Sequence, residues 1–229
     1  MKGNIIKDVF FDLDHTLWDF DKNSALAFGC IFDESHPSIA IGNFIEAYIP
    51  INQSCWKLFQ YNKITHEELR YNRLKHSFDA LGYSISDVEI NRISDQYIDI
   101  LPENNHLFDG AFEILDYLKS KYKLHIITNG FAEVQYKKMN NAKLTPYFTT
   151  ITNSEMAGVK KPNPMIFEYA LDLAKANKES SIMIGDSLDA DVQGALDVGL
   201  DAILFNENKS DTFTNIKQIN HLLELKKYL

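Results

Sequence analysis

Four short apolar runs, each ending at a polar turn, most constrain how this chain can fold. Apolar runs of this length suit strands that are buried on both faces of a parallel sheet. Amphipathic helical patterns lie between them, with apolar residues three and four positions apart. This alternation predicts an α/β fold with a parallel sheet and right-handed crossovers. The four runs are Asp8–Phe11, Leu124–Ile127, Ser181–Ile184 and Ala202–Phe205.

Two of the predicted helices are clear from their apolar spacing. Ala111–Leu118 forms one, and Ile166–Ala174 forms the other. The second is entered through Pro162 and Pro164, which we interpret as first-turn prolines because proline is favoured at the first helical position.

A long helical stretch interrupts the strand pattern. From residue 18 to residue 106 we find only helix signals, including capping boxes that begin at Thr65 and Ser86. Because this stretch leaves from the end of the first strand, it can act as a lid over that end. We expect residues 1–17 and 107–229 to form a Rossmann-like core, and residues 18–106 to form an all-helical cap.

Charge and cysteine content exclude several classes of protein. The net charge of −9 over 229 residues argues against a broad basic surface for nucleic acid. Cys30 and Cys55 match no zinc spacing, and we interpret both as small buried hydrophobic residues in a reducing compartment. No apolar run is long enough for a signal peptide or a membrane span. We expect a soluble, cytoplasmic protein without a membrane partner. The sequence leaves its oligomeric state open.

Two carboxylates, Asp12 and Asp14, stand at the end of the first apolar run. Side chains two residues apart in an extended segment point to the same side, and ligands bind at this end of the strands in open α/β sheets. Two like charges side by side are costly unless a cation lies between them or they share a proton. The pair therefore predicts a metal site, a pair of acid/base groups, or both.

Three further polar clusters follow predicted strands or open a helix. A hydroxyl, an amide and a glycine at a strand-to-helix turn can bind an anion through backbone N–H groups. In the second cluster, a lysine before a proline is held at the entry of a helix. In the third, a glycine is followed by several acids, so this cluster offers carboxylates as Asp12 and Asp14 do. The clusters are Thr128-Asn129-Gly130, Lys160-Lys161-Pro162 and Gly185-Asp186 with Asp189 and Asp191.

Together these clusters fit the hydrolysis of a phosphate ester. Asp12 and Asp186, from adjacent strand ends, can bind Mg²⁺, which prefers carboxylate oxygens and a substrate phosphate. Lys161 and Thr128 can hold the remaining phosphate oxygens. Asp12 can then attack phosphorus, while Asp14 protonates the leaving oxygen and later activates water.

The four clusters, in this order, resemble the haloacid dehalogenase-like superfamily along the whole chain. The resemblance implies that Asp12 is the nucleophile, that Asp14 is the acid/base, and that Thr128 and Lys161 bind phosphate. It implies a Mg²⁺ site formed by Asp12, the backbone carbonyl of Asp14 and Asp186.

The same resemblance assigns supporting roles. It implies that Asp191 supports the metal site, and that Asn129 and Gly130 add contacts to the substrate. The true dehalogenases of the superfamily lack the second acid and work without a metal. Because Asp14 is present, we reject dehalogenation and expect a phosphatase that acts on a small phosphorylated metabolite.

A closer resemblance exists to the pyrimidine 5′-nucleotidases that dephosphorylate noncanonical nucleoside monophosphates. It is carried by Ile127–Phe131, Gly158–Asn163, Ile166–Leu171 and Thr16–Asp21. We therefore expect a phosphoric monoester hydrolase acting on nucleoside 5′-monophosphates of the pyrimidine type. The alternatives are a sugar-phosphate phosphatase or phosphomutase of the same superfamily, and a non-catalytic binding protein on the same fold.

Several aromatic and basic residues of the predicted cap are candidate substrate contacts. Trp18 and Phe20, beside the nucleophile, are the favoured candidates to stack on a base. The aromatic residues at helical spacing, Phe44, Tyr48, Trp56 and Phe59, are expected in the core of the cap. The three arginines, Arg70, Arg73 and Arg92, are expected on exposed helix faces. His15 is interpreted as structural.

Overall fold

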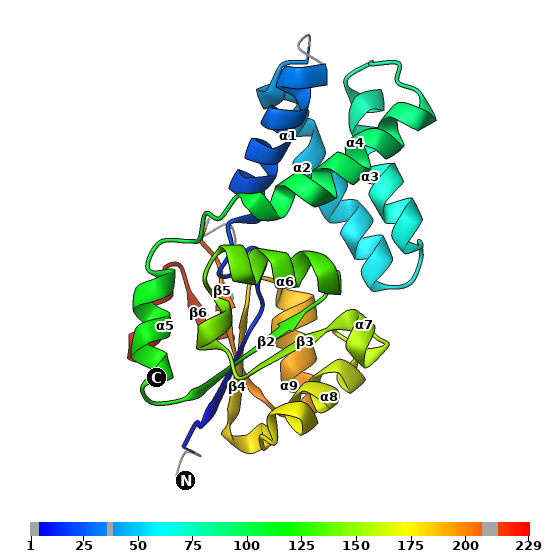
Figure 1. Cartoon of the computed structure of the whole chain (residues 1–229). Helices are drawn as coiled ribbons and strands as arrows, with labels where there is room; N and C mark the ends of the chain where they lie inside the picture. Colours follow the sequence, from blue (N-terminus) through cyan, green and yellow to red (C-terminus); the bar gives the residue numbers. More distant parts are fainter. Residues whose placement is uncertain (1–4, 36–38, 208–214) are drawn as a thin grey trace. The chain divides into compact units, whose positions relative to one another are not determined.

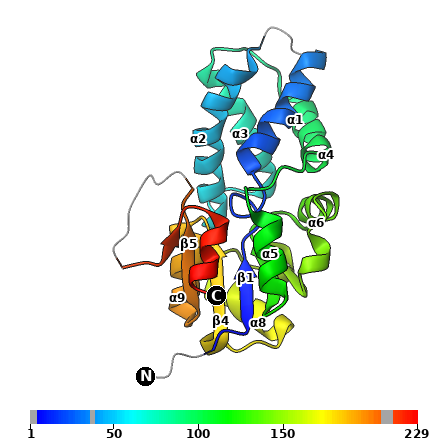
Figure 2. The ribbon, with the colours of Figure 1, turned by 90° about the vertical axis from the view of Figure 1, so that its left-hand side faces the viewer.

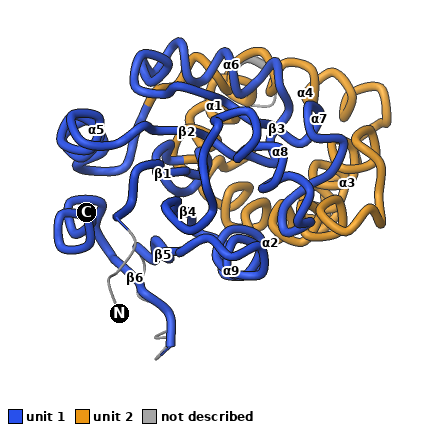
Figure 3. The backbone as a smooth tube through the Cα atoms, turned by 90° about the horizontal axis from the view of Figure 1, so that it is seen from below, with its two compact units in different colours: residues 1–19, 106–229 blue, residues 20–105 orange. Residues whose placement is uncertain are grey.

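The chain divides into two compact units. The computed structural model describes residues 5–35, 39–207 and 215–229. One unit comprises Met1–Asp19 and His106–Leu229, and the other comprises Phe20–Asn105 (Figure 3). The first contains a sheet with helices, and the second is built from helices alone (Figure 1). We call them the α/β unit and the helical unit.

The α/β unit contains a parallel sheet in the order β3-β2-β1-β4-β5-β6. Figure 2 shows β1 beside β4, near the centre of the sheet. The predicted α/β fold with a parallel sheet is confirmed. The strands are β1 (Asp8–Phe11), β2 (Lys123–Thr128), β3 (Thr150–Asn153), β4 (Ser181–Gly185), β5 (Asp201–Phe205) and β6 (Gln218–Ile219).

Two edge strands, β3 and β6, are absent from the prediction. The four predicted runs correspond to β1, β2, β4 and β5, which are almost entirely buried. By contrast, β3 alternates threonine with other residues and is half-buried over its first two positions, and β6 has two residues. A search for continuous apolar runs detects buried strands and passes over such edges.

Helices cover both faces of the sheet. Helices α5 and α6 lie on one side, and α8 and α9 lie on the other (Figure 3). Helix α8 begins at Pro164 with Asn163 as its N-cap, so Pro164 is a first-turn proline whereas Pro162 precedes the helix. The helices are α5 (Ala111–Lys119), α6 (Ala132–Asn141), α7 (Ser154–Ala157), α8 (Pro164–Ala174) and α9 (Gly194–Val198), with short helices η2 (Thr145–Tyr147), η3 (Lys178–Ser180), η4 (Leu188–Gln193) and η5 (Leu222–Lys227).

The helical unit has an aromatic core. Phe44 and Tyr48 are buried there as predicted, whereas Trp56 and Phe59 are half-buried and contact each other edge to face. Phe28 contacts Phe44 and Tyr48. The helices of this unit are α1 (Phe20–Ser35), α2 (Ile41–Gln60), α3 (His66–Ala80) and α4 (Asp87–Ile100), followed by η1 (Leu101–Glu103).

Two of its helices start as their capping signals predict. Thr65 forms a complete capping box with Glu68 at the start of α3. At α4 the Ser86 hydroxyl accepts from the Glu89 N–H, while the Glu89 carboxylate binds Arg92.

One arginine and one cysteine differ from their predicted environments. Arg73 is buried rather than exposed, whereas Arg70 and Arg92 are half-buried and pair with Asp95 and Glu89. Cys55 is buried as predicted, but Cys30 is exposed because its position on α1 faces away from the aromatic core. Among the described residues, none of the helices combines the length and hydropathy needed to cross a membrane.

Candidate active site

The predicted polar clusters meet at the carboxyl ends of neighbouring strands. Asp12 follows β1, Thr128 ends β2, and Asp186 follows β4. Strand β1 lies between β2 and β4, and the backbone N–H of Asp12 donates to the carbonyl of Ile184 at 2.9 Å. Parallel strands place their carboxyl ends along one edge, so these residues become neighbours although they are far apart in sequence.

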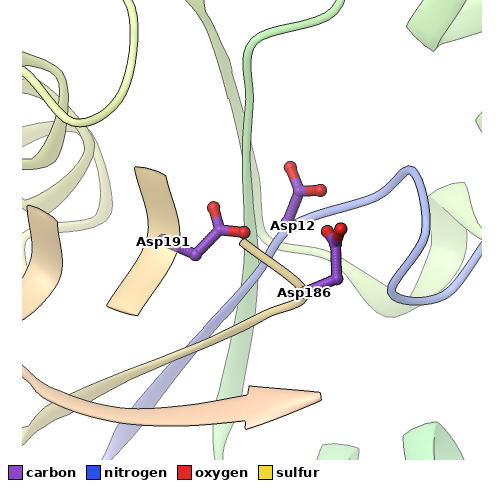
Figure 4. Close-up of side chains that lie close together, drawn as sticks. All are labelled: Asp12, Asp186 and Asp191. Carbon is purple, nitrogen blue, oxygen red and sulfur yellow. The ribbon is translucent and has the colours of Figure 1, made fainter. Parts of the chain in front are cut away.

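Three carboxylates converge at this edge. Ligand oxygens of Asp12, Asp186 and Asp191 all lie within 4.8 Å of one another (Figure 4). Gly185 makes this convergence possible, because a Cβ atom at that position would lie 2.3 Å from the Asp191 carboxyl carbon. The glycine before Asp186 therefore provides the space that Asp191 occupies.

Lys161 lies between two of the carboxylates. Its ammonium group donates to Asp12 Oδ1 at 2.6 Å, to Asp191 Oδ1 at 2.6 Å and to the carbonyl of Ile127 at 2.7 Å. The side chain is 2% exposed. Burial lowers the pKa of Lys161, but the charges of Asp12 and Asp191 outweigh burial and leave that pKa above its ordinary value. Lys161 is therefore held as a cation.

One ammonium does not balance three carboxylates. Burial raises the pKa of Asp12 well above its ordinary value despite the opposing charge of Lys161, and the charges of Asp191 and Asp186 add to the rise. Burial, with a contribution from Asp191, raises the pKa of Asp186 to about 8. Such a cluster of carboxylate oxygens suits a hard divalent cation, which would favour the ionised forms.

Asp191 differs in role from the other two acids. One of its oxygens binds Lys161, and the other accepts from the backbone N–H of Ser187 at 3.0 Å. Both oxygens therefore support neighbouring groups. Thr16, which we did not predict as part of the site, donates to Asp186 Oδ1 at 3.4 Å.

The Thr128 hydroxyl faces a fixed set of donors. Its oxygen accepts from the backbone N–H of Gly130 at 3.1 Å and from Gln135 Nε2 at 2.7 Å. A hydroxyl has one hydrogen and two acceptor positions, so the hydrogen of Thr128 remains to be donated to a ligand.

Asn129 binds protein backbone in this structure. Its Oδ1 accepts from the N–H of Lys161 at 2.7 Å, and its Nδ2 donates to the carbonyl of Lys161 at 3.0 Å. The amide thereby fixes the segment that carries the lysine. Gly130 uses its N–H on Thr128. The substrate contacts expected for Asn129 and Gly130 stay predictions.

Asp14 lies outside the three-acid cluster and binds helix α6. Its Oδ1 accepts from Lys138 Nζ at 2.7 Å, and its Oδ2 accepts from Gln135 Nε2 at 2.9 Å. Sequence reasoning missed both partners. They occupy buried positions on the same helix as Val134 and Met139. A polar residue at a core position of an amphipathic helix was the signal that could have identified them.

The residues after Asp14 are tightly folded. His15 adopts a left-handed conformation with φ of +61°, and its N–H donates to the carbonyl of Trp18 at 2.9 Å. The Trp18 side chain is 0% exposed, with Lys138 Nζ 4.2 Å from the centroid of its ring. The ring is buried in this conformation, and the predicted stacking role of Trp18 stays a prediction.

Comparison with known proteins agrees with this geometry. Residues 9–205 match the haloacid dehalogenase-like hydrolase family. The chain belongs to this family. This family membership confirms the resemblance to the superfamily. The expected roles of the site residues were based on that resemblance.

Several relatives of this hydrolase cover nearly the whole chain. It is 32% identical to the HAD-hydrolase YfnB of Bacillus subtilis, over 96% of this chain and 92% of YfnB. It is 31% identical to the pyrimidine 5′-nucleotidase PynA of Streptococcus pneumoniae, over 91% of this chain and 87% of PynA. It is 28% identical to the glyceraldehyde 3-phosphate phosphatase of Pyrococcus abyssi, over 90% of this chain and 83% of that protein.

The fold of this hydrolase also matches a solved structure of YfnB. The two superpose with a TM-score of 0.88 at 31% identity and cover 99% of each chain. That crystal structure is described as bound to magnesium and as revealing interdomain movement.

Proposed function

We propose that this hydrolase cleaves phosphate monoesters in a Mg²⁺-dependent reaction, with Asp12 as the nucleophile. The observation that carries the proposal is the buried Asp12 carboxylate, held by Lys161 at 2.6 Å and flanked by Asp186 and Asp191. An anionic nucleophile beside further acids needs positive charge before a phosphate can approach. Family membership supports the same chemistry.

The nucleophilic step uses the oxygen of Asp12 that does not bind Lys161. With Oδ1 held by the ammonium, Oδ2 attacks phosphorus and forms an aspartyl-phosphate as the bond to the leaving oxygen breaks. Lys161 fixes the carboxylate and contributes positive charge. The Thr128 hydroxyl donates its hydrogen to a phosphate oxygen.

The second carboxylate, Asp14, handles the protons. We propose that it gives a proton to the leaving oxygen and then takes one from the water that hydrolyses the aspartyl-phosphate. Both oxygens of Asp14 bind α6 in this structure, so the carboxylate is held by two side-chain donors.

The residues around Asp12 fit a magnesium ion. Asp12, Asp186 and the backbone carbonyl of Asp14 would hold it, with Asp191 in a supporting role through Lys161. When bound, the ion neutralises charge on the phosphate and on the acids around it.

Nucleoside 5′-monophosphates of the pyrimidine type are the proposed substrates. The likeness to PynA over most of both chains supports this choice. A sugar-phosphate phosphatase is the second candidate, supported by the likeness to the glyceraldehyde 3-phosphate phosphatase. No observation favours a phosphomutase. A non-catalytic binding protein is disfavoured because each predicted catalytic position is filled. The cytoplasmic location and the lid role of residues 18–106 stay predictions.

The deciding experiment measures phosphate release from a panel of nucleoside monophosphates and sugar phosphates, with Mg²⁺ and with EDTA. We expect Mg²⁺-dependent release that is strongest with pyrimidine monophosphates. Release confined to sugar phosphates would keep the mechanism and replace the substrate class. No release from any member would contradict the phosphatase assignment.

Two variants test the assigned residues. Asp12→Asn should abolish turnover while the far-ultraviolet circular dichroism stays unchanged, and a normal rate would remove Asp12 as the nucleophile. Asp186→Asn should raise the Mg²⁺ concentration at half-maximal activity. An unchanged Mg²⁺ titration would point to another ligand.

A further inference from the structure

Helix α6 holds both oxygens of the Asp14 carboxylate. Lys138 Nζ donates to Oδ1 at 2.7 Å, and Gln135 Nε2 donates to Oδ2 at 2.9 Å. The two donors are three residues apart, so they lie on the same face of the helix. We call Gln135 and Lys138 the Asp14 clamp.

The clamp is supported by residues on both sides. Gly130 makes room for it, because a Cβ atom there would lie 2.4 Å from Gln135 Nε2. On the other side the Lys138 ammonium lies 4.2 Å from the centroid of the Trp18 ring, a cation–π contact. Gln135 Nε2 also donates to the Thr128 hydroxyl at 2.7 Å, so one amide joins Asp14 to Thr128.

Packing alone does not account for these side chains. Gln135 and Lys138 are 1% and 2% exposed, and burying an amide or an ammonium is costly without polar partners. Their buried neighbours on α6, Val134 and Met139, show that this face otherwise takes apolar side chains. The polar pair is therefore explained by what it binds: both side chains donate to the carboxylate of Asp14, and Gln135 also donates to the Thr128 hydroxyl.

We propose that Gln135 and Lys138 are positioning residues that hold Asp14 for the hydrolysis of the aspartyl-phosphate. This inference rests on the proposed function. In that step the oxygen of water bonds to phosphorus and the bond from phosphorus to the Asp12 oxygen breaks. The proton of the water passes to the Asp14 carboxylate. Two donors at fixed positions restrict how the carboxylate can turn, and misplacing a catalytic group by about 1 Å costs about 10²-fold in rate.

The test uses Lys138→Met and the aryl ester p-nitrophenyl phosphate, whose leaving group needs no proton. Formation of the aspartyl-phosphate should then be nearly unaffected, whereas its hydrolysis should slow by about 10²-fold. We expect a burst of about one nitrophenolate per enzyme, a kcat lower by a similar factor and a kcat/KM close to that of the wild type. Trapped aspartyl-phosphate should be detectable by acid quench.

Two further variants keep the inference falsifiable. Lys137→Met removes the adjacent lysine, which pairs with Glu133 at the surface, and should behave as wild type. Gln135→Met removes a neutral donor and should give a smaller burst of the same kind if Lys138→Met fails to fold.

Each remaining outcome decides against the inference. Equal losses of kcat and kcat/KM without a burst would show that the pair is structural. Wild-type kinetics in both clamp variants would show that Asp14 does not depend on them. If the wild-type enzyme released no nitrophenolate or phosphate from any ester, the proposed function would fail and the inference with it.

Discussion

Two buried cations, one in each unit, have opposite surroundings. Lys161 in the α/β unit and Arg73 in the helical unit are each 2% exposed. Lys161 donates to two carboxylates and a carbonyl. Arg73 donates to the amide oxygen of Asn52, at 3.5 Å, and its guanidinium carbon lies 4.9 Å from the centroid of the Tyr97 ring. Within the described residues, its Nε and Nη2 atoms have no hydrogen-bond partner.

The two cations therefore differ in how the cost of burying them is offset. A buried ion is costly unless opposite charge and hydrogen bonds offset the desolvation. Lys161 is paired with Asp12 and Asp191, so removing any one of the three leaves a buried charge without one of its partners. No acid among residues 5–35, 39–207 and 215–229 pairs with Arg73, so removing its guanidinium leaves no carboxylate without a partner there. We therefore expect the stability of the α/β unit to be sensitive to the loss of Lys161. The helical unit should tolerate the loss of Arg73.

The largest expected effect comes from Lys161→Met. Removing the ammonium leaves Asp12 and Asp191 buried without their cation, so stability should fall by about 3–5 kcal/mol and turnover should be lost. Urea unfolding of the metal-free protein measures the first effect. Lys160→Met, at the neighbouring half-buried lysine, is the matched control and should change stability little. Equal effects of the two variants would break the comparison.

A second contrast concerns two glycines, one in each unit. Gly185→Ala would place a methyl group 2.3 Å from the Asp191 carboxyl carbon and should cost about 1–3 kcal/mol, with reduced activity. Gly29 lies inside α1, and a methyl group added there would lie more than 4 Å from any described atom beyond its chain neighbours and the backbone of its own helix, so Gly29→Ala should stabilise by about 0.5–1 kcal/mol. Thermal unfolding of both variants checks the two signs, and a stabilised Gly185→Ala would show that Asp191 can move.

A third prediction concerns pH. Burial lowers the pKa of the His125 imidazole, against the raising effect of its hydrogen bond to Asp8. Below about pH 6.5 the unfolded chain binds a proton that folded His125 does not, so stability should fall as pH decreases. The slope should be at most about 1.4 kcal/mol per pH unit from this group. Urea unfolding between pH 5 and 8 should show a weaker dependence in His125→Gln. An unchanged dependence would mean that the pKa of His125 is the same in the folded and unfolded chains.

The smallest effect is expected at Arg73. Arg73→Met replaces the guanidinium with an apolar chain and leaves none of the described acids unpaired, so stability should rise by about 0–1 kcal/mol. Arg70→Met, at a surface pair with Asp95, provides a control of similarly small effect. A loss as large as that of Lys161→Met would show that Arg73 is held by an anion.

Much of the candidate site could be predicted from the sequence. Asp12, Thr128 and Asp186 follow buried apolar runs, and parallel strands bring such positions to one edge. The α/β class follows from the same runs. The edge strands were missed because half-buried and very short strands lack a continuous apolar pattern.

The apolar runs do not indicate which side chains or backbone groups the predicted residues contact. Asn129, whose expected substrate contact stays a prediction, binds the backbone of Lys161. Trp18, whose expected stacking on a base stays a prediction, is buried against Lys138. In both cases the residue lies where the strand pattern places it, and its side chain turns toward a neighbour that is distant in sequence.

The sequence by itself determined which strand ends carry the acids and the hydroxyl, because hydrophobic periodicity identifies buried strands and their ends. It also placed the lysine at a helix entry, beside a proline. Only the tertiary structure decided that Lys138 and Gln135 hold Asp14 and that Arg73 is buried without an acid partner in the part of the chain that the structure describes. The physical reason is that side-chain contacts depend on how each helix is rotated against its neighbours, which packing of the whole unit sets.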